Sequence, residues 1–256
     1  MVNGHELVRA ALDAVDGGES VVVATVVETD RSVPRHAGSK MLVYGDRRQV
    51  GTIGGGEMEA RVIDASVDVL ASGSPRLMNF DLVDPASGDP GVCGGTITLY
   101  LEPLVPEPNV VIVGCGHVGK AVADLAHWLG YGVSALDDRA ELATAEQLPT
   151  ADEVLAGPIA EMLGRASITA QTHIVLVTRN LAVDLEAIPV ALATPARSIG
   201  VMGSNRRWGI TSQKLIDAGV DAAQLDRVRS PIGLDISAET PQQIAVSIMA
   251  EITELG

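Results

Sequence analysis

The sequence predicts an α/β protein, with a small amino-terminal α+β domain followed by a Rossmann-like domain built on a doubly wound parallel sheet. Three observations predict this class. Strand and helix patterns follow one another irregularly over the first hundred residues. Three prolines then interrupt the chain, and regular strand–helix alternation follows them. We therefore expect domains at residues 1–102 and 109–256, joined by a stiff proline-rich linker at 103–108.

The first domain begins with an amphipathic helix near residues 5–15, whose apolar side chains fall on one stripe. Runs rich in β-branched residues then predict strands at 21–28, 41–44 and 49–53. A helix is expected at about 57–71, and two further strands at 77–83 and 96–101. This irregular order favours an α+β domain.

The second domain opens with the short apolar run 110–114, which is typical of a buried parallel strand. A helix over 118–129 and a strand over 133–136 complete the first βαβ unit. Later strands are expected at 153–155, 173–178 and 198–202. The chain closes with a helix whose start is marked by the capping box of Thr240 and Gln243.

Composition excludes several functional classes. The chain has 256 residues and a formal net charge of −15, the wrong sign for a protein that neutralises nucleic-acid phosphates. No apolar stretch approaches the roughly 20 residues that span a bilayer, and the first residues lack the pattern of a signal peptide. Cys93 and Cys115 form no disulfide framework, and no Cys or His spacing indicates a metal site. We expect a cytoplasmic protein with free thiols and neither nucleic-acid nor membrane partners.

The clearest motif is a GxGxxG run formed by Gly114, Gly116 and Gly119, placed after a strand and before a helix. Its glycines permit a tight turn and the close approach of a pyrophosphate to the helix N-terminus. Asp137 follows about 20 residues later and suits the ribose hydroxyls of NAD, whereas nearby Arg139 leaves NADP open. A dinucleotide site is favoured over a site for S-adenosylmethionine or another adenine nucleotide, and over an inherited fold with a vacant site.

A second glycine run, Gly54 to Gly56, lies between a strand and a helix. It either cradles a phosphate or is a strained connector, because glycine serves both needs equally well. Glu57 and Glu59 favour the helix dipole there but oppose a bound phosphate.

Two further loops carry chemically distinctive residues. Arg35 and Lys40 lie beside glycine-containing turns and are either ligands for an anion or solvated charges. Cys93, followed by Gly94 and Gly95, is either a buried inert thiol or an accessible one that a partner approaches closely.

Taken in order, several segments resemble the XdhC/CoxI type of xanthine dehydrogenase accessory factors. They are SVPRHAGSKMLV, GTIGGGEMEA, VCGGTITLYLEPL, VVIVGCGHVGKAVADLA, IGVMGSNRR and SPIGLDISAETPQQIAVSIMAEI. The resemblance runs from about residue 20 to the C-terminus. It implies a homodimeric cytoplasmic chaperone, rather than an enzyme, that binds molybdenum cofactor. Such a protein assists cofactor sulfuration and insertion into a molybdenum hydroxylase of the xanthine or carbon monoxide dehydrogenase type, with a cysteine desulfurase as a further partner.

The resemblance also implies site residues. Cys93 falls at a position suited to a transient molybdenum ligand or a sulfur relay. The cofactor-binding positions are Arg35, Gly54, Gly55, Gly56, Glu59, Gly94, Gly95, Gly114, Gly116, His117, Gly119 and Asp137.

One departure from the family pattern concerns the segment after the fourth strand of the second domain. Many relatives carry a His-Asp-His run there, whereas this chain reads Thr178-Arg179-Asn180-Leu181 and keeps only the later Asp184. Any role of those histidines cannot operate in this chain. The second domain also leaves two alternative interpretations, an NAD(P)-binding regulatory protein and an NAD-dependent oxidoreductase.

Overall fold

The computed structural model describes residues 4–82 and 94–255, so Cys93 lies outside the described residues. The chain divides into two compact units, residues 1–106 and 107–256. Each unit contains its own sheet and its own hydrophobic core. In the part of the chain that the structure describes, no helix is long and apolar enough to cross a membrane.

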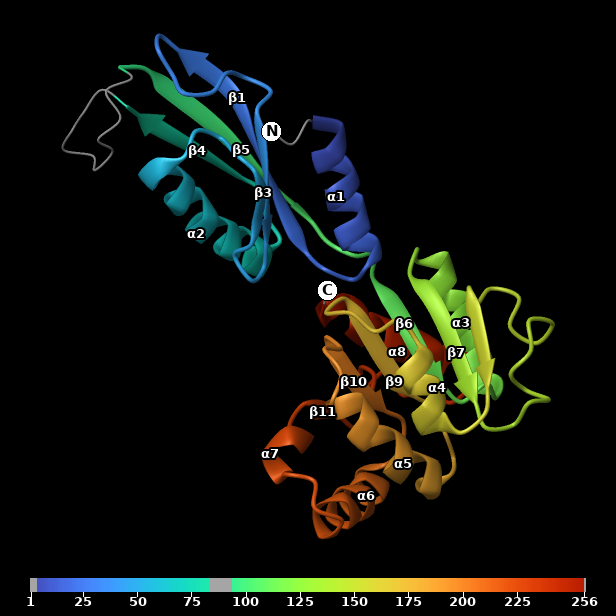
Figure 1. Cartoon of the computed structure of the whole chain (residues 1–256). Helices are drawn as coiled ribbons and strands as arrows, with labels where there is room; N and C mark the ends of the chain where they lie inside the picture. Colours follow the sequence, from blue (N-terminus) through green and yellow to red (C-terminus); the bar gives the residue numbers. More distant parts are fainter. Residues whose placement is uncertain (1–3, 83–93, 256) are drawn as a thin grey trace. The chain divides into compact units, whose positions relative to one another are not determined.

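The first unit is built on a five-stranded antiparallel sheet with the order β3-β2-β1-β5-β4 (Figure 1). Its strands are β1 (Val21–Asp30), β2 (Lys40–Tyr44), β3 (Gln49–Gly51), β4 (Arg76–Asp81) and β5 (Thr96–Leu104). Its helices are α1 (Gly4–Asp16) and α2 (Gly56–Ser72).

The two helices of this unit cover opposite faces of the sheet, because side chains alternate along each strand. Val22 and Val26 of β1 pack with Val62 of α2 in one buried cluster. Val21, the neighbour of Val22, packs with Leu7 of α1 in a second cluster. Strand β1 is therefore buried from both sides over its first residues.

The second unit is built on a six-stranded parallel sheet with the order β11-β10-β9-β6-β7-β8. Its strands are β6 (Asn109–Val113), β7 (Gly132–Asp137), β8 (Glu153–Ala156), β9 (Thr172–Leu176), β10 (Ser198–Val201) and β11 (Val228–Arg229). Its helices are α3 (His117–Trp128), α4 (Ile159–Arg165), α5 (Leu181–Leu192), α6 (Asn205–Asp217), α7 (Ala222–Leu225) and α8 (Pro241–Leu255).

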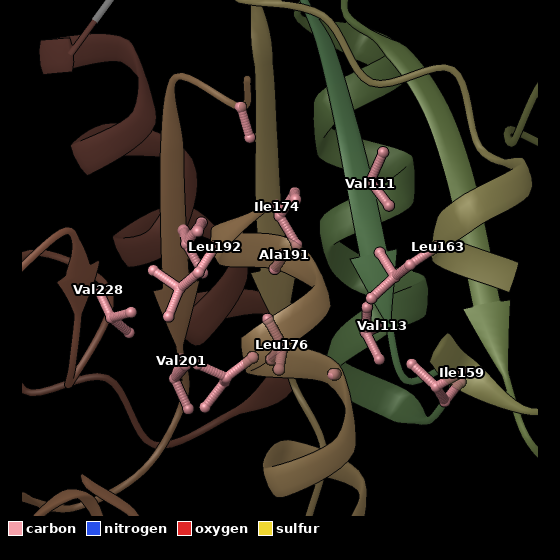
Figure 2. Close-up of a cluster of buried hydrophobic side chains, with 14 of the residues drawn as sticks. Val111, Val113, Ile159, Leu163, Ile174, Leu176, Ala191, Leu192, Val201 and Val228 are labelled. Atoms are coloured by element: carbon pink, nitrogen blue, oxygen red, sulfur yellow. The ribbon is translucent and has the colours of Figure 1, made fainter. Parts of the chain in front are cut away.

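Helices cover both faces of this sheet. Val111 and Val113 of β6 pack with Leu163 of α4 in the cluster shown in Figure 2. Ile112, between them in sequence, packs with Ile248 of α8 on the other face. The predicted fold class, an α+β domain followed by a doubly wound parallel sheet, is confirmed.

The strand order also locates a natural binding position. Strand β6 pairs with β7 on one side and with β9 on the other. The strands after β6 are added first on one side of it (β7, β8) and then on the other (β9, β10, β11), so the strand order reverses between β6 and β9. Ligands of open α/β sheets bind beyond the carboxyl ends of the strands at such a switch point.

Candidate functional site

A cavity of about 750 Å³ lies at this switch point. Its walls come from the residues that follow β6, from the end of β7, from the segment after β9 and from the start of α8. Representative lining residues are Gly114, His117, Asp137, Thr178 and Ile244. Four of the elements that the sequence predicted separately therefore meet around one cavity.

The three glycines of the turn between β6 and α3 meet different demands. Gly114 has φ +112°, and a Cβ atom there would lie 3.2 Å from the carbonyl of Val177. A Cβ atom on Gly119 would collide with the carbonyl oxygen of Gly114. Gly116, by contrast, has open space around it and begins α3 without a side-chain cap. Gly114 and Gly119 are therefore required by packing, whereas Gly116 is the position that a ligand can approach.

Asp137 is bound by its own chain. Its side chain is 1% exposed, and its carboxylate accepts the N–H of Cys115 at 2.7 Å. It also accepts the main-chain N–H, Nε and Nη2 of Arg139, each at 2.9 Å. Burial opposes ionisation, but the hydrogen bonds from Arg139 and Cys115 lower the pKa of Asp137 below its ordinary value. The carboxylate is thus ionised and fastens the glycine turn to the end of β7.

The neighbouring Asp138 is in a different state. Its side chain is 50% exposed, and it lines the cavity. Partial burial, and then the carboxyl group of Asp137, raise the pKa of Asp138 above its ordinary value. Asp138 therefore presents a more exposed carboxyl group to the cavity than Asp137 does.

Cations surround the same cavity. Lys120, Arg139 and Arg179 line it together with the two carboxylates of Asp137 and Asp138. Lys120 donates to the side-chain oxygen of Gln147, which holds the ammonium group at the cavity's edge. In a chain with a net charge of −15, this local excess of cations suits a ligand with anionic groups.

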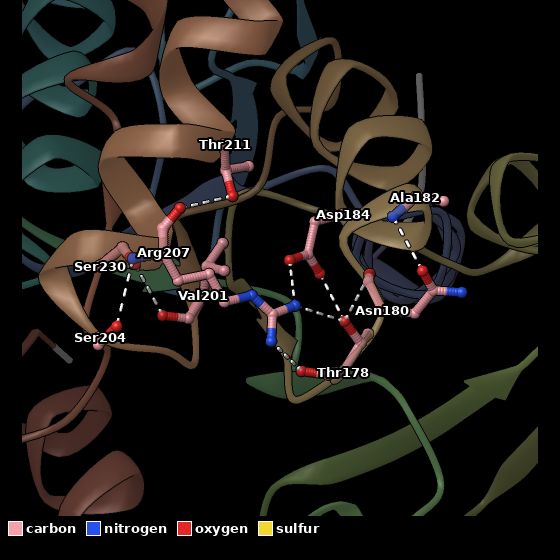
Figure 3. Close-up of polar contacts among 9 residues, drawn as sticks. All are labelled: Thr178, Asn180, Ala182, Asp184, Val201, Ser204, Arg207, Thr211 and Ser230. Atoms are coloured by element: carbon pink, nitrogen blue, oxygen red, sulfur yellow. Dashed lines mark hydrogen bonds and ion pairs between the residues drawn. The ribbon is translucent and has the colours of Figure 1, made fainter.

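A buried polar cluster supports the wall of the cavity formed by the segment after β9 (Figure 3). Asp184, which is fully buried, accepts the hydroxyl of Thr178 and the Nη2 of Arg207, both at 2.5 Å. Arg207 Nη1 also donates to the main-chain oxygen of Thr178 at 3.0 Å. Among the buried side-chain nitrogen and oxygen atoms of the described residues, the Nε of Arg207 is the one without a hydrogen-bond partner.

Sequence reasoning singled out Asp184 but missed Arg207, its partner from helix α6. The segment that replaces the His-Asp-His run also has a local structural role. Asn180 begins α5, and its side chain accepts the N–H of Ala182 at 3.0 Å. In the described residues, no group of three or more His, Cys, Asp or Glu side chains is placed to hold a metal ion.

In the first unit, Glu59 fixes the triple-glycine loop. Its buried carboxylate accepts the N–H of Gly55 at 2.7 Å, the hydroxyl of Thr52 at 2.8 Å and the side-chain amide of Gln49 at 2.7 Å. The N–H of Gly54 donates to the hydroxyl of Thr52 at 3.2 Å. Two main-chain donors of this loop are therefore engaged by its own side chains.

Three motifs of the first unit converge on one another. A Cβ atom on Gly54 would lie 2.8 Å from Pro34 Cγ, so the glycine loop packs against the segment before Arg35. A Cβ atom on Gly95 would lie 2.5 Å from the carbonyl oxygen of Ser32. Gly94 adjoins it with φ +69° and open space around it.

The other candidates of this unit have different surroundings. Lys40 Nζ donates to the hydroxyl of Thr25 at 2.8 Å, which holds this cation along the strand pair. Arg35 is half-buried and also interacts with its surroundings. The cavity-lining residues belong to the second unit and the converging loops to the first.

Comparison with known proteins gives concordant matches along both units. Residues 110–252 match the XdhC Rossmann domain, and residues 14–81 match the XdhC and CoxI family. The uncharacterized protein YqeB of Escherichia coli (strain K12) is 32% identical over 238 residues, which cover 91% of this chain and 43% of YqeB.

Two further relatives have names that describe a function. A probable xanthine dehydrogenase component of Bacillus subtilis (strain 168) is 27% identical over 159 residues, 62% of this chain and 46% of the relative. The chain thus spans less than half the length of YqeB and of this dehydrogenase component. The molybdenum cofactor insertion chaperone PaoD of Escherichia coli (strain K12) is 23% identical over 306 residues, 97% of this chain and 87% of PaoD.

Among solved structures, a xanthine dehydrogenase from Bacillus halodurans is similar with a TM-score of 0.52 and 21% identity. The match covers 96% of this chain and 94% of that chain. At this identity, the similarity establishes a shared fold.

Proposed function

Because the chain belongs to the XdhC and CoxI family, we propose that it is an accessory protein that binds molybdenum cofactor and assists its insertion into a molybdenum hydroxylase. The relative PaoD, whose name describes this role, aligns with 97% of the chain. In this proposal the cofactor is a cargo that the protein passes on. The client is an enzyme of the xanthine or carbon monoxide dehydrogenase type.

The structural observation that carries the proposal is the cation-lined cavity of the second unit. Molybdenum cofactor is a pterin phosphate and is therefore anionic. Lys120, Arg139 and Arg179 would attract its phosphate, and the first turn of α3 beyond Gly116 would offer main-chain donors. The donor set of this cavity thus fits the phosphate-bearing part of the cargo.

The loops of the first unit are the second part of the proposal. Gly54 and Gly55 have donors engaged by Thr52 and Glu59, so we assign these glycines to shaping the loop and not to holding an anion. Arg35 and Gly94 lie on the surrounding loops and are the candidates for contact with the cargo. We propose that Cys93 acts there as a transient soft ligand or sulfur relay, because the molybdenum of this cofactor is already held by the sulfur atoms of its dithiolene and a thiolate is a ligand of the same kind.

Sulfuration and assembly extend the proposal. A sulfur relay needs a sulfur donor, and a cysteine desulfurase is the partner of that chemical class. We further propose that the protein acts as a homodimer in the cytoplasm, where its client would mature.

A nucleotide-binding regulatory role is the second candidate. The three glycines of the β6–α3 turn and the adjoining cavity favour it, because this combination suits a pyrophosphate or dinucleotide such as NAD(P). Nucleotide binding without cofactor binding would support this role over the chaperone role.

The decisive experiment is anaerobic binding of purified molybdenum cofactor, followed by activation of an apo molybdenum hydroxylase. We expect binding of about one cofactor per chain and a gain of client activity. Cys93→Ser should abolish activation while the protein melts normally. The matched control is Cys115→Ala, since burial and then the charge of Asp137 raise the pKa of the Cys115 thiol to about 12. A folded protein that binds no cofactor would overturn the proposal.

A further inference from the structure

In a Rossmann fold the acid after the second strand normally accepts the ribose hydroxyls, but in this chain its carboxylate is buried and bound by other groups of the protein. Asp137 occupies that position at the end of β7, yet its four acceptor contacts are filled by Cys115 and Arg139. Its side chain is 1% exposed. A ribose could reach this carboxylate only by displacing Arg139 from three hydrogen bonds.

Asp138 has the exposure that Asp137 lacks. Half of its side chain is exposed, and it lines the cavity at the same edge. Its contact with Arg139 joins carboxylate oxygen and Nε at 3.8 Å, which is too long for a hydrogen bond. The carboxyl group of Asp137 is its other neighbour and has no proton to donate when both groups are ionised, so the carboxylate of Asp138 can accept hydroxyl donors from a ligand.

We propose that Asp138, and not Asp137, accepts the ribose hydroxyls of a nucleotide bound in this cavity, and that the nucleotide carries an unphosphorylated ribose diol. The inference rests on the proposed nucleotide binding. A vicinal diol offers two O–H donors, which matches the two oxygens of a carboxylate. Asp137 then has a structural role, holding the glycine turn and Arg139 in place.

The local charge favours the same ligand. The cavity as a whole has an excess of cations, but its edge at Asp137, Asp138 and Arg139 carries one net negative charge at neutral pH. A phosphate on the ribose 2′ oxygen would meet a repulsive carboxylate at Asp138 there. Arg139 is fixed in place by Asp137 and is 54% exposed, so one face of its guanidinium is available for stacking on a base. NAD⁺ is therefore preferred to NADP⁺.

The test is a calorimetric titration of the full chain with NAD⁺ and NADP⁺, which differ only in the 2′-phosphate. We expect NAD⁺ to bind about 10-fold more tightly than NADP⁺, as loss of a charge-assisted hydrogen bond implies. Asp138→Asn should weaken NAD⁺ about 10-fold and reduce the difference between the two nucleotides. Glu141→Gln is the matched control, since it removes one exposed carboxylate close in sequence that does not line the cavity.

A second variant separates the two acids. Asp137→Asn should lower the melting temperature, because it weakens the bonds to the glycine turn, whereas Asp138→Asn should melt like the original protein. Tighter binding of NADP⁺, or unchanged NAD⁺ affinity in Asp138→Asn, would overturn the inference while nucleotide binding itself stood. If neither nucleotide binds to folded protein, both the inference and the regulatory role fail. The chaperone role is still judged separately by client activation.

Discussion

Asp184, which is buried, and Arg207, whose side chain is 24% exposed, form an ion pair 2.5 Å long, and both side chains also hold Thr178. Asp184 comes from α5 and Arg207 from α6, so the pair links two helices to the segment that leaves β9. That segment forms one wall of the cavity. The pair therefore fixes the cavity wall without lining the cavity itself.

Asp184→Asn is expected to destabilise the second unit by about 3 kcal/mol, because it leaves the charge of Arg207 with poor compensation inside the protein. Urea unfolding followed by circular dichroism measures this change. Glu254→Gln, which removes an exposed carboxylate, is the control and should leave the unfolding midpoint unchanged. An unaltered midpoint in Asp184→Asn would show that the pair adds nothing to stability.

Glu59→Gln is expected to lower the free energy of unfolding by about 2 kcal/mol. The carboxylate accepts three hydrogen bonds in a buried position, and an amide cannot accept them all. Glu57→Gln is a close control, since Glu57 lies in the same first turn of α2 but is exposed. Equal stability of the two variants would contradict the structural role of Glu59.

Gly116→Ala should impair nucleotide binding, whereas Gly119→Ala should impair stability. Gly116 has φ −75° and open space, so the alanine variant should melt normally and lose affinity for nucleotides about 10-fold or more through contact with the ligand. Gly119→Ala should lower the melting temperature, because the added methyl group collides with Gly114. Thermal melting and nucleotide titration on both variants check this. Normal nucleotide affinity in a stable Gly116→Ala protein would contradict close approach at this position.

We expect the protein to lose stability in acid because of the buried imidazole of His173. The ring is buried, one nitrogen lies 2.7 Å from the hydroxyl of Ser198, and burial followed by the charge of Arg197 lowers its pKa from 6.5 to about 4. The unfolded chain therefore binds a proton that the folded chain does not. The stabilising contribution is complete above about pH 6.5 and falls by roughly 3 kcal/mol as the pH approaches 4.

Urea unfolding at pH 7.5 and pH 4.5 measures this dependence. His173→Gln should show a smaller difference between the two pH values than the original protein. His127→Gln, which removes an exposed imidazole, should keep the full difference. The same pH dependence in all three proteins would exclude His173 as its source.

A feature of the site could be predicted from the sequence when its residues are close together in the chain. The GxGxxG turn was predictable because strand, glycines and helix are adjacent in the sequence. Arg207 was missed because its partner Asp184 lies in another helix, and only the packing of α5 against α6 brings them together. The segment from Gly203 to Arg207 did stand out in the sequence, but nothing in the sequence indicated which acid Arg207 would pair with.

Asp137 and Glu59 illustrate a second limit. The sequence indicated that these two acids belong to the sites of the two glycine loops, and the structure places each of them beside its loop. Whether such a carboxylate faces a ligand or its own backbone depends on side-chain and main-chain positions that differ by only about one or two ångströms. Asp137 and Glu59 each accept a main-chain N–H of the neighbouring loop, a pairing that no periodicity or spacing reveals.

The contact between Pro34 and Gly54 couples two positions in the evolution of this family. The pyrrolidine ring fills the space that any side chain at position 54 would need. A larger residue at 54 could thus be accepted only after the ring at 34 had been lost, and Gly54 must also tolerate a φ of +140°. Related sequences should change at these two positions together, with glycine retained at 54 wherever proline is retained at 34.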